Sequence, residues 1–169
     1  MNAACNQEDI RRRAVDLARS RKTLTLATSD NNFPWAAPVY YVFVRGLFYF
    51  FSDPETRHIR DIMRTGRAAA AIFDDDGAGW RELRGIQMTG GVARVTPGRS
   101  AAAALAAYLK KFPLVADMAP KEIALDLSFF ASRFRAHLYA LTPETIYYMD
   151  NTVRFGFRTE ITFDGMDSR

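Results

Sequence analysis

The feature that most constrains the fold is an apolar run from Ala36 to Phe51, which is broken at one place by Arg45-Gly46. Its two halves, Ala36–Val44 and Leu47–Phe51, are rich in the Val, Tyr and Phe residues that favour β-strands. Gly46 can adopt the positive φ that a tight hairpin turn requires. Because both faces of this predicted hairpin are apolar, we expect one face to line a barrel core and the other to contact a partner.

Alternating apolar residues predict further strands, and apolar residues at helical spacing predict helices. A helix is predicted to follow the hairpin: Asp53 suits its N-cap, Pro54 its first position and Gly66 its C′ position. Ser100 suits the N-cap of a later helix. The segment 121–130 is amphipathic and its type stays open. We expect the remaining strands at 23–28, 68–73, 83–95, 133–141, 146–149 and 153–161, and helices at 8–20, 54–65 and 100–111.

These elements predict one α+β domain over residues 1–169, built on an antiparallel β-barrel of six to seven strands with short flanking helices, and a disordered tail at 163–169. The first twenty residues contain no apolar stretch of the kind found in signal peptides, and no segment reaches the length of a membrane span. We therefore expect a cytoplasmic protein without a membrane partner.

Charge and composition narrow the possible ligands. The net charge is +4 and the pI is about 9.4, which weakly favours an anionic ligand, and no nucleic-acid-binding motif is present. One cysteine, Cys5, and two histidines, His58 and His137, do not supply the ligands of a Cys/His zinc site. We expect no metal. His137 lies in an alternating segment, where a solvated or interface position is the simplest reading.

The segment Ser52–Arg64 carries the strongest local signal for a binding site. An apolar strand ends in Ser52 and leads directly into the predicted helix, whose first turn offers unpaired N–H groups and a partial positive charge. Ser52 and Thr56 add hydroxyl groups, and Arg57 adds a guanidinium suited to two phosphate oxygens. A solvated basic face is the other reading, because Arg57, Arg60 and Arg64 form one stripe. His58 lies on a different flank, where it either binds phosphate or faces water.

The order of these motifs resembles the pyridoxamine 5′-phosphate oxidase-like family of FMN-binding split barrels. The hairpin is followed by S-D-x-x-T-R-H-x-R-x-I at residues 52–62, then by a strand, then by Arg84-Gly85-Ile86-Gln87. The resemblance spans about residues 10–115, and within the family the chain resembles a small bacterial branch without an assigned reaction. The segment D-N-T-V-R-F-G-F at 150–157 also resembles that branch.

The resemblance implies an antiparallel split β-barrel that forms a homodimer, with FMN in a groove between the two barrels. It implies that Ser52, Arg57 and His58, where the oxidases carry an Arg-Lys pair, contact the phosphate. It also implies that Gln87 approaches the flavin, whose mixed edge an amide suits because it both donates and accepts. The backbone expected to face the edge of the flavin ring belongs to Pro38, Val39 and Tyr40.

Two departures separate the chain from the oxidases themselves. The oxidases carry an Arg and a Lys along the strand that corresponds to Ala37–Phe43, and this chain has neither there. Their C-terminal substrate signature is also missing, which argues against pyridoxamine phosphate oxidation. We therefore expect an FMN-dependent oxidoreductase acting on an unidentified small molecule, with no catalytic side chain assigned. The alternative is a non-catalytic flavin- or haem-binding module that serves as a sensor or store, with His58 or His137 as the haem ligand. Deazaflavin and haem are the cofactors to weigh against FMN.

Overall fold

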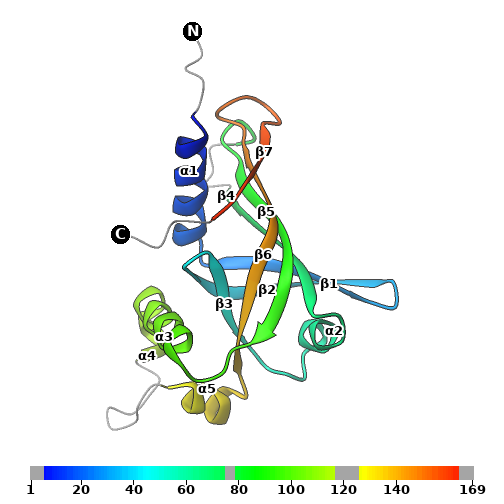
Figure 1. The fold of residues 1–169 in the computed structure, drawn as a ribbon, viewed down its shortest axis with the longest axis vertical. Helices are drawn as coiled ribbons and strands as arrows, with labels where there is room; N and C mark the ends of the chain where they lie inside the picture. Colours follow the sequence, from blue (N-terminus) through cyan, green and yellow to red (C-terminus); the bar gives the residue numbers. More distant parts are fainter. Residues whose placement is uncertain (1–5, 75–78, 117–125, 164–169) are drawn as a thin grey trace.

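The computed structural model describes residues 6–74, 79–116 and 126–163, and over these ranges it shows seven strands and five helices (Figure 1). The strands are antiparallel and lie in the order β3-β2-β1-β4-β5-β6-β7, and an additional pairing between β3 and β6 closes the first six into a barrel. The strands are β1 (Thr23–Asp30), β2 (Phe33–Val44), β3 (Leu47–Ser52), β4 (Arg67–Asp74), β5 (Arg84–Arg94), β6 (His137–Asp150) and β7 (Arg158–Ile161). The predicted α+β split barrel is confirmed.

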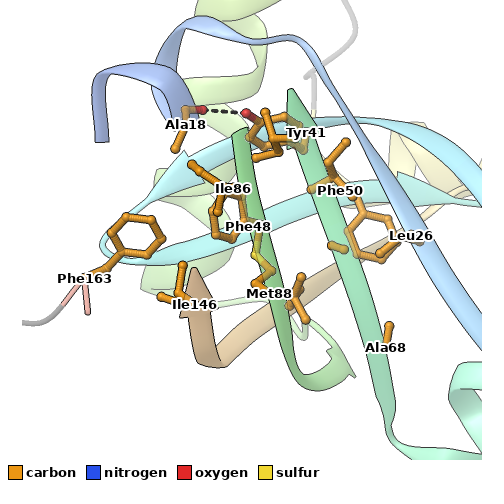
Figure 2. Close-up of a cluster of buried hydrophobic side chains, with 14 of the residues drawn as sticks. Ala18, Leu26, Tyr41, Phe48, Phe50, Ala68, Ile86, Met88, Ile146 and Phe163 are labelled. Atoms are coloured by element: carbon orange, nitrogen blue, oxygen red, sulfur yellow. Dashed lines mark hydrogen bonds between the residues drawn. The ribbon is translucent and has the colours of Figure 1, made fainter. Parts of the chain in front are cut away.

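The barrel interior is filled by the inward-facing residues of the strands, because successive side chains point to opposite faces. Phe48 and Phe50 on β3 are fully buried, and they face Leu26, Ile86 and Met88 from other strands (Figure 2). Tyr41 is also buried, and its hydroxyl donates a hydrogen bond of 2.7 Å to the carbonyl of Ala18. Burial raises the pKa of Tyr41 far above its usual range, so that this hydroxyl stays a donor.

Two helices extend the barrel core, and two others form a second core outside it. The apolar faces of α1 (Gln7–Ser20) and α2 (Arg57–Thr65) belong to the same buried cluster as the barrel interior. In contrast, α3 (Arg99–Lys111) and α5 (Leu127–Phe134) pack with the outward side chains of β2, β3 and β6, and the short helix α4 (Pro113–Ala116) follows α3. None of the helices among the described residues is long and apolar enough to cross a membrane.

The segment from 126 to 163 differs most from the sequence prediction. Phe134 belongs to α5 rather than to a strand, because the Asp126 carboxylate accepts hydrogen bonds from the N–H groups of Ser128 and Phe129 and starts a helix there. The expected strands 133–141 and 146–149 form one strand, β6, and residues 153–157 form a turn before β7. The predicted disordered tail is wrong at Phe163, which is buried; residues 164–169 lie outside the described residues.

Both predicted helix caps are also corrected. The helix α3 begins after Gly98, so that Ser100 lies inside its first turn. The helix α2 begins after Thr56, because Asp53 forms a turn of its own before it: the Asp53 carboxylate accepts from the N–H of Glu55 at 2.8 Å, and its carbonyl accepts from the N–H of Thr56 at 3.1 Å. Gly66, with φ of 70°, ends α2 as predicted.

A glycine permits the bulge that keeps β5 and β6 paired along their full length. The register between these strands shifts between Thr89 and Gly90. A Cβ atom at Gly90 would lie 2.0 Å from the carbonyl oxygen of Thr142, whereas one at Gly91 would meet its first neighbour, a carboxylate oxygen of Glu144, at 3.8 Å. The close approach of two backbones therefore requires glycine at position 90.

We expect Gly90→Ala to lower the free energy of unfolding by about 2–3 kcal/mol, because the new methyl group must displace the backbone of β6. Urea denaturation followed by circular dichroism measures this change. Gly91→Ala is the matched control and should change stability by less than about 1 kcal/mol. Equal effects of the two substitutions would contradict this account of the bulge.

Candidate functional site

The candidate site lies where β3 ends and α2 begins. Ser52 is the last residue of β3, and its buried hydroxyl forms a hydrogen bond of 2.8 Å with Nε2 of His58 on the first turn of α2. The hydroxyl of Thr56 lies 3.3 Å from that of Ser52, and it donates to the carbonyl of Asp53 at 2.7 Å. The structure thus brings together Ser52, Thr56 and His58, three of the residues that the sequence had singled out.

His58 is buried, so the alternative that it faces water is wrong. Burial lowers the pKa of His58, and the carboxylate of Asp61, one turn further along α2, opposes this effect. A lowered pKa favours the neutral imidazole, which can carry only one ring proton. His58 therefore acts here mainly as a hydrogen-bonding partner that holds Ser52 in place.

Arg57 is held in one orientation by three contacts. Its guanidinium lies over the ring of Trp35, 4.7 Å from the centroid, and one of its nitrogens donates to the carbonyl of Phe33 at 3.2 Å. Its Nε lies 3.9 Å from a carboxylate oxygen of Asp61. Asp61 is buried and accepts a hydrogen bond of 2.9 Å from the hydroxyl of Thr28. Because the Arg57 side chain is still 41% exposed, this oriented cation can bind an anion without a large rearrangement.

The first turn of α2 leaves backbone donors available. The side chain of its N-cap, Thr56, contacts Nε2 of His58 at 3.4 Å but makes no capping hydrogen bond to a backbone N–H of the helix, and the first turn contains no acidic residue. The first N–H groups of a helix have no partner within that helix, and they lie at the positive end of its dipole. Arg57 is the first residue of this helix. The arrangement therefore combines open N–H groups with a fixed guanidinium, as an anion-binding site requires.

The predicted stripe of three arginines does not behave as one unit. Arg57 is anchored as described above, whereas Arg64 forms an ion pair with Asp30 near the β1–β2 turn. The apolar face of α2 is narrow: Ile59 and Ile62 are fully buried, whereas the neighbouring Met63 is 54% exposed.

The strand β2 extends beyond the end of its neighbour β3. It pairs with β3 over Tyr41–Val44, whereas its pairing with β1 extends over Phe33–Tyr40. The sequence-predicted residues Pro38, Val39 and Tyr40 lie in this extension. Val39 points into the barrel core, and Pro38 and Tyr40 are exposed on the outer face. The backbone edge of this extension lies beyond the last β2–β3 pair, on the side of the sheet where β3 leads into α2.

Gln87 lies apart from the other predicted site residues. It is exposed on β5 and belongs to a row across the outer face in which Pro38 pairs with Thr25, Thr25 with Ala71, and Ala71 with Gln87. Neighbouring strands are spaced by about 4.8 Å, which places Gln87 about 14 Å from Pro38 within one chain. The structure therefore does not bring Gln87 into contact with the Ser52–His58 group.

Sequence reasoning missed Asp61 and Thr28 as parts of the site, and it left the role of Trp35 open. The spacing of four residues between Arg57 and Asp61 is the one signal that could have indicated their ion pair. The contacts of Thr28 and Trp35 depend on how β1 and β2 pack against α2. Among the described residues, no group of three or more His, Cys, Asp or Glu side chains could hold a metal ion.

Comparison with known proteins agrees with this architecture. The family model described as pyridoxamine 5′-phosphate oxidase matches residues 10–150. The chain belongs to this family. An UPF0306 protein of Pasteurella multocida is 35% identical over 82 residues, which are 47% of this chain and 54% of that protein. The chain thus matches about half the length of this curated relative.

Solved structures share the fold at low sequence identity. A haem-binding protein from Mycobacterium smegmatis is 21% identical, with a TM-score of 0.67 over 94% of this chain and 58% of that chain. An FAD-binding protein from Mesorhizobium loti is 15% identical, with a TM-score of 0.59 over 79% of this chain and 89% of that chain. At these identities the likeness shows the fold alone. The family's known neighbours thus include both flavin-binding and haem-binding proteins.

The influence of Asp61 on His58 is testable by titration. We expect Asp61→Asn to lower the pKa of His58 further, because it removes the nearby negative charge that opposes the effect of burial. NMR titration of the His58 imidazole measures this shift. Asp30→Asn is the matched control, since Asp30 pairs with Arg64 instead, and it should leave the His58 pKa unchanged. A rise of the His58 pKa in Asp61→Asn would contradict this assignment.

Proposed function

We propose that this protein binds FMN and that the start of α2 holds its phosphate. The observation that carries this proposal is the uncapped first turn of α2 beside the anchored guanidinium of Arg57. A phosphate dianion suits this arrangement, because the backbone N–H groups and the guanidinium can bind several of its oxygens at once. Ser52 adds a hydroxyl group whose orientation is set by His58.

The proposed flavin ring lies along the exposed extension of β2. The backbone edge around Pro38, Val39 and Tyr40 supplies donors and acceptors for the ring edge, and Trp35 lies beside Arg57. Within one chain, Gln87 lies about 14 Å from Pro38. We therefore assign its contact with the same flavin to a second copy of the chain. The proposal therefore includes a homodimer, in which the partner's Gln87 completes the site.

The outer face of β1, β2, β4 and β5 suits this dimer. It carries rows of small side chains, such as Ala36, Ala27 and Ala69, that are not fully buried within one chain. Larger aromatic residues are exposed on the same face of these strands: Tyr40 is 58% exposed and Phe73 is 59% exposed. A flat face of small residues bordered by aromatic side chains can pack closely against its own copy.

Within this proposal the protein is an FMN-dependent oxidoreductase of a small molecule. Bound FMN supplies two-electron chemistry, and the chain orients the ring and restricts its solvent access. The alternative is a flavin-binding module without turnover. Stopped-flow mixing of the FMN-loaded protein with NADH or NADPH separates the two, since rapid bleaching of the flavin absorbance supports the oxidoreductase and a stable spectrum supports the module.

Haem binding is the second candidate, favoured by the haem-binding protein among the structural neighbours. Nε2 of His58 is engaged by Ser52. In His137, Nδ1 accepts a hydrogen bond from Arg94, which leaves the ring proton on Nε2, so His137 can ligate iron through Nε2 only after this hydrogen bond is broken and the proton moves to Nδ1. The absorption spectrum of the purified protein, with or without added haemin, distinguishes a flavoprotein from a haem protein.

We expect Arg57→Gln to weaken FMN binding at least tenfold in a fluorescence titration, because it removes the fixed cation beside the phosphate. Binding of riboflavin, which lacks the phosphate, should change by less than about twofold. Arg60→Gln, on the same helix, is the matched control and should bind FMN as the unaltered protein does. The proposal fails if the unaltered protein does not bind FMN, or if Arg57→Gln binds it with equal affinity.

The dimer is tested by a charge on its proposed face. We expect Ala71→Arg to convert a dimer into a monomer and to weaken FMN binding, because a guanidinium would be buried without a partner at the centre of the face. Analytical ultracentrifugation measures the assembly state. Ala106→Arg, on the exposed face of α3, should remain dimeric. A monomeric unaltered protein with full FMN affinity would exclude the shared site.

A further inference from the structure

A cavity of about 360 Å³ lies where β5 ends and β6 begins, close to the end of β3 at Ser52. It shares no residue with the proposed phosphate site, although His137 at its rim is the β6 partner of Ser52. Its walls come from the end of β5, the segment that follows it, α5 and the start of β6. The apolar side chains that line it are Val95, Pro97, Leu127, Ala131 and Leu138.

One end of this cavity is polar and cationic. Arg94 donates a hydrogen bond of 3.0 Å to Nδ1 of His137, and both residues line the cavity. An imidazole that accepts at Nδ1 carries its proton on Nε2, so that the ring presents a further N–H donor. Partial burial and the charge of Arg94 lower the pKa of His137, which keeps this form dominant, although Asp53 opposes the shift.

Arg94 is exposed and, among the described residues, forms no ion pair of its own. The Asp53 carboxylate, whose charge also acts on His137, pairs instead with Arg135 at 3.6 Å. The other polar groups around the cavity, Thr96 and Ser128, are neutral, and the Ser128 hydroxyl donates to Asp126. The cavity therefore combines apolar walls with one cation and a second N–H donor at one end, and it is within the size range of small-molecule sites.

We propose that this cavity binds a medium-chain monocarboxylate. The carboxylate accepts from the guanidinium of Arg94 and from Nε2–H of His137, and the hydrocarbon chain lies between Val95, Leu127 and Leu138. This ligand matches the cavity in charge and in polarity, because a carboxylate can pair with the guanidinium whereas a neutral alkane cannot, and an inorganic anion would leave the apolar walls exposed to water. The two sites share no residue, and we expect the carboxylate and FMN to bind independently.

Isothermal titration calorimetry with octanoate tests this proposal on the full chain, with and without bound FMN. We expect a dissociation constant on the order of 0.1–1 mM for a ligand of this size. Octan-1-ol, which has the same chain without the charge, should bind at least tenfold more weakly. Arg94→Gln should weaken octanoate binding at least tenfold, and Arg99→Gln, a neutralised arginine outside the cavity, should leave it unchanged.

A second variant separates the cavity from simple surface attraction. Ala131→Leu narrows the apolar part and keeps Arg94, so it should also weaken octanoate binding, while circular dichroism checks that each variant remains folded. The proposal is overturned if octanoate fails to bind at about 10 mM, if octanol binds equally well, or if either Arg94→Gln or Ala131→Leu retains full affinity. FMN titration of the same variants reports on the phosphate site separately, and it should be unaffected by Arg94→Gln.

Discussion

The antiparallel pairing of β3 with β6 is the constraint on which the rest of the structure depends. It closes six strands into a barrel, and it ends at the pair Ser52 and His137. Because β3 ends there, the chain turns into α2 at that point, and β2 continues without β3 beside it. One closing pair of strands thus positions the open helix start, the exposed strand edge and the cavity near His137.

The electrostatic character of the site follows from packing rather than from the number of charges. Arg57, Arg60 and Arg64 occur at similar helical spacing, yet their surroundings differ. Arg57 is fixed by Trp35, Phe33 and the buried Asp61, whereas Arg64 is neutralised by Asp30. A buried carboxylate behind an exposed guanidinium limits its motion, which reduces the entropy lost when an anion binds.

Much of the fold could be predicted because it depends on local pattern. The hairpin around Gly46, the helix end at Gly66 and the bulge at Gly90 each follow from a backbone requirement that glycine meets. Helix starts were less predictable, because Asp53 and Ser100 are suited to a turn as well as to a cap. The single strand β6 was also missed, since Thr142–Thr145 shows no apolar alternation and is held by its pairing with β5.

The sequence by itself determined the class of fold, the family and the residues around the start of α2, because these depend on strand and helix patterns that act over short distances. Only the tertiary structure decided that His58 is buried against Ser52, that Arg57 is anchored by Trp35 and Asp61, and that Gln87 lies on a distant strand. These facts depend on which strands pair and in which register, and one residue of register moves every side chain to the other face of the sheet. The segment Ser52–Arg64 therefore has its chemistry from its sequence and its geometry from the closure of the barrel.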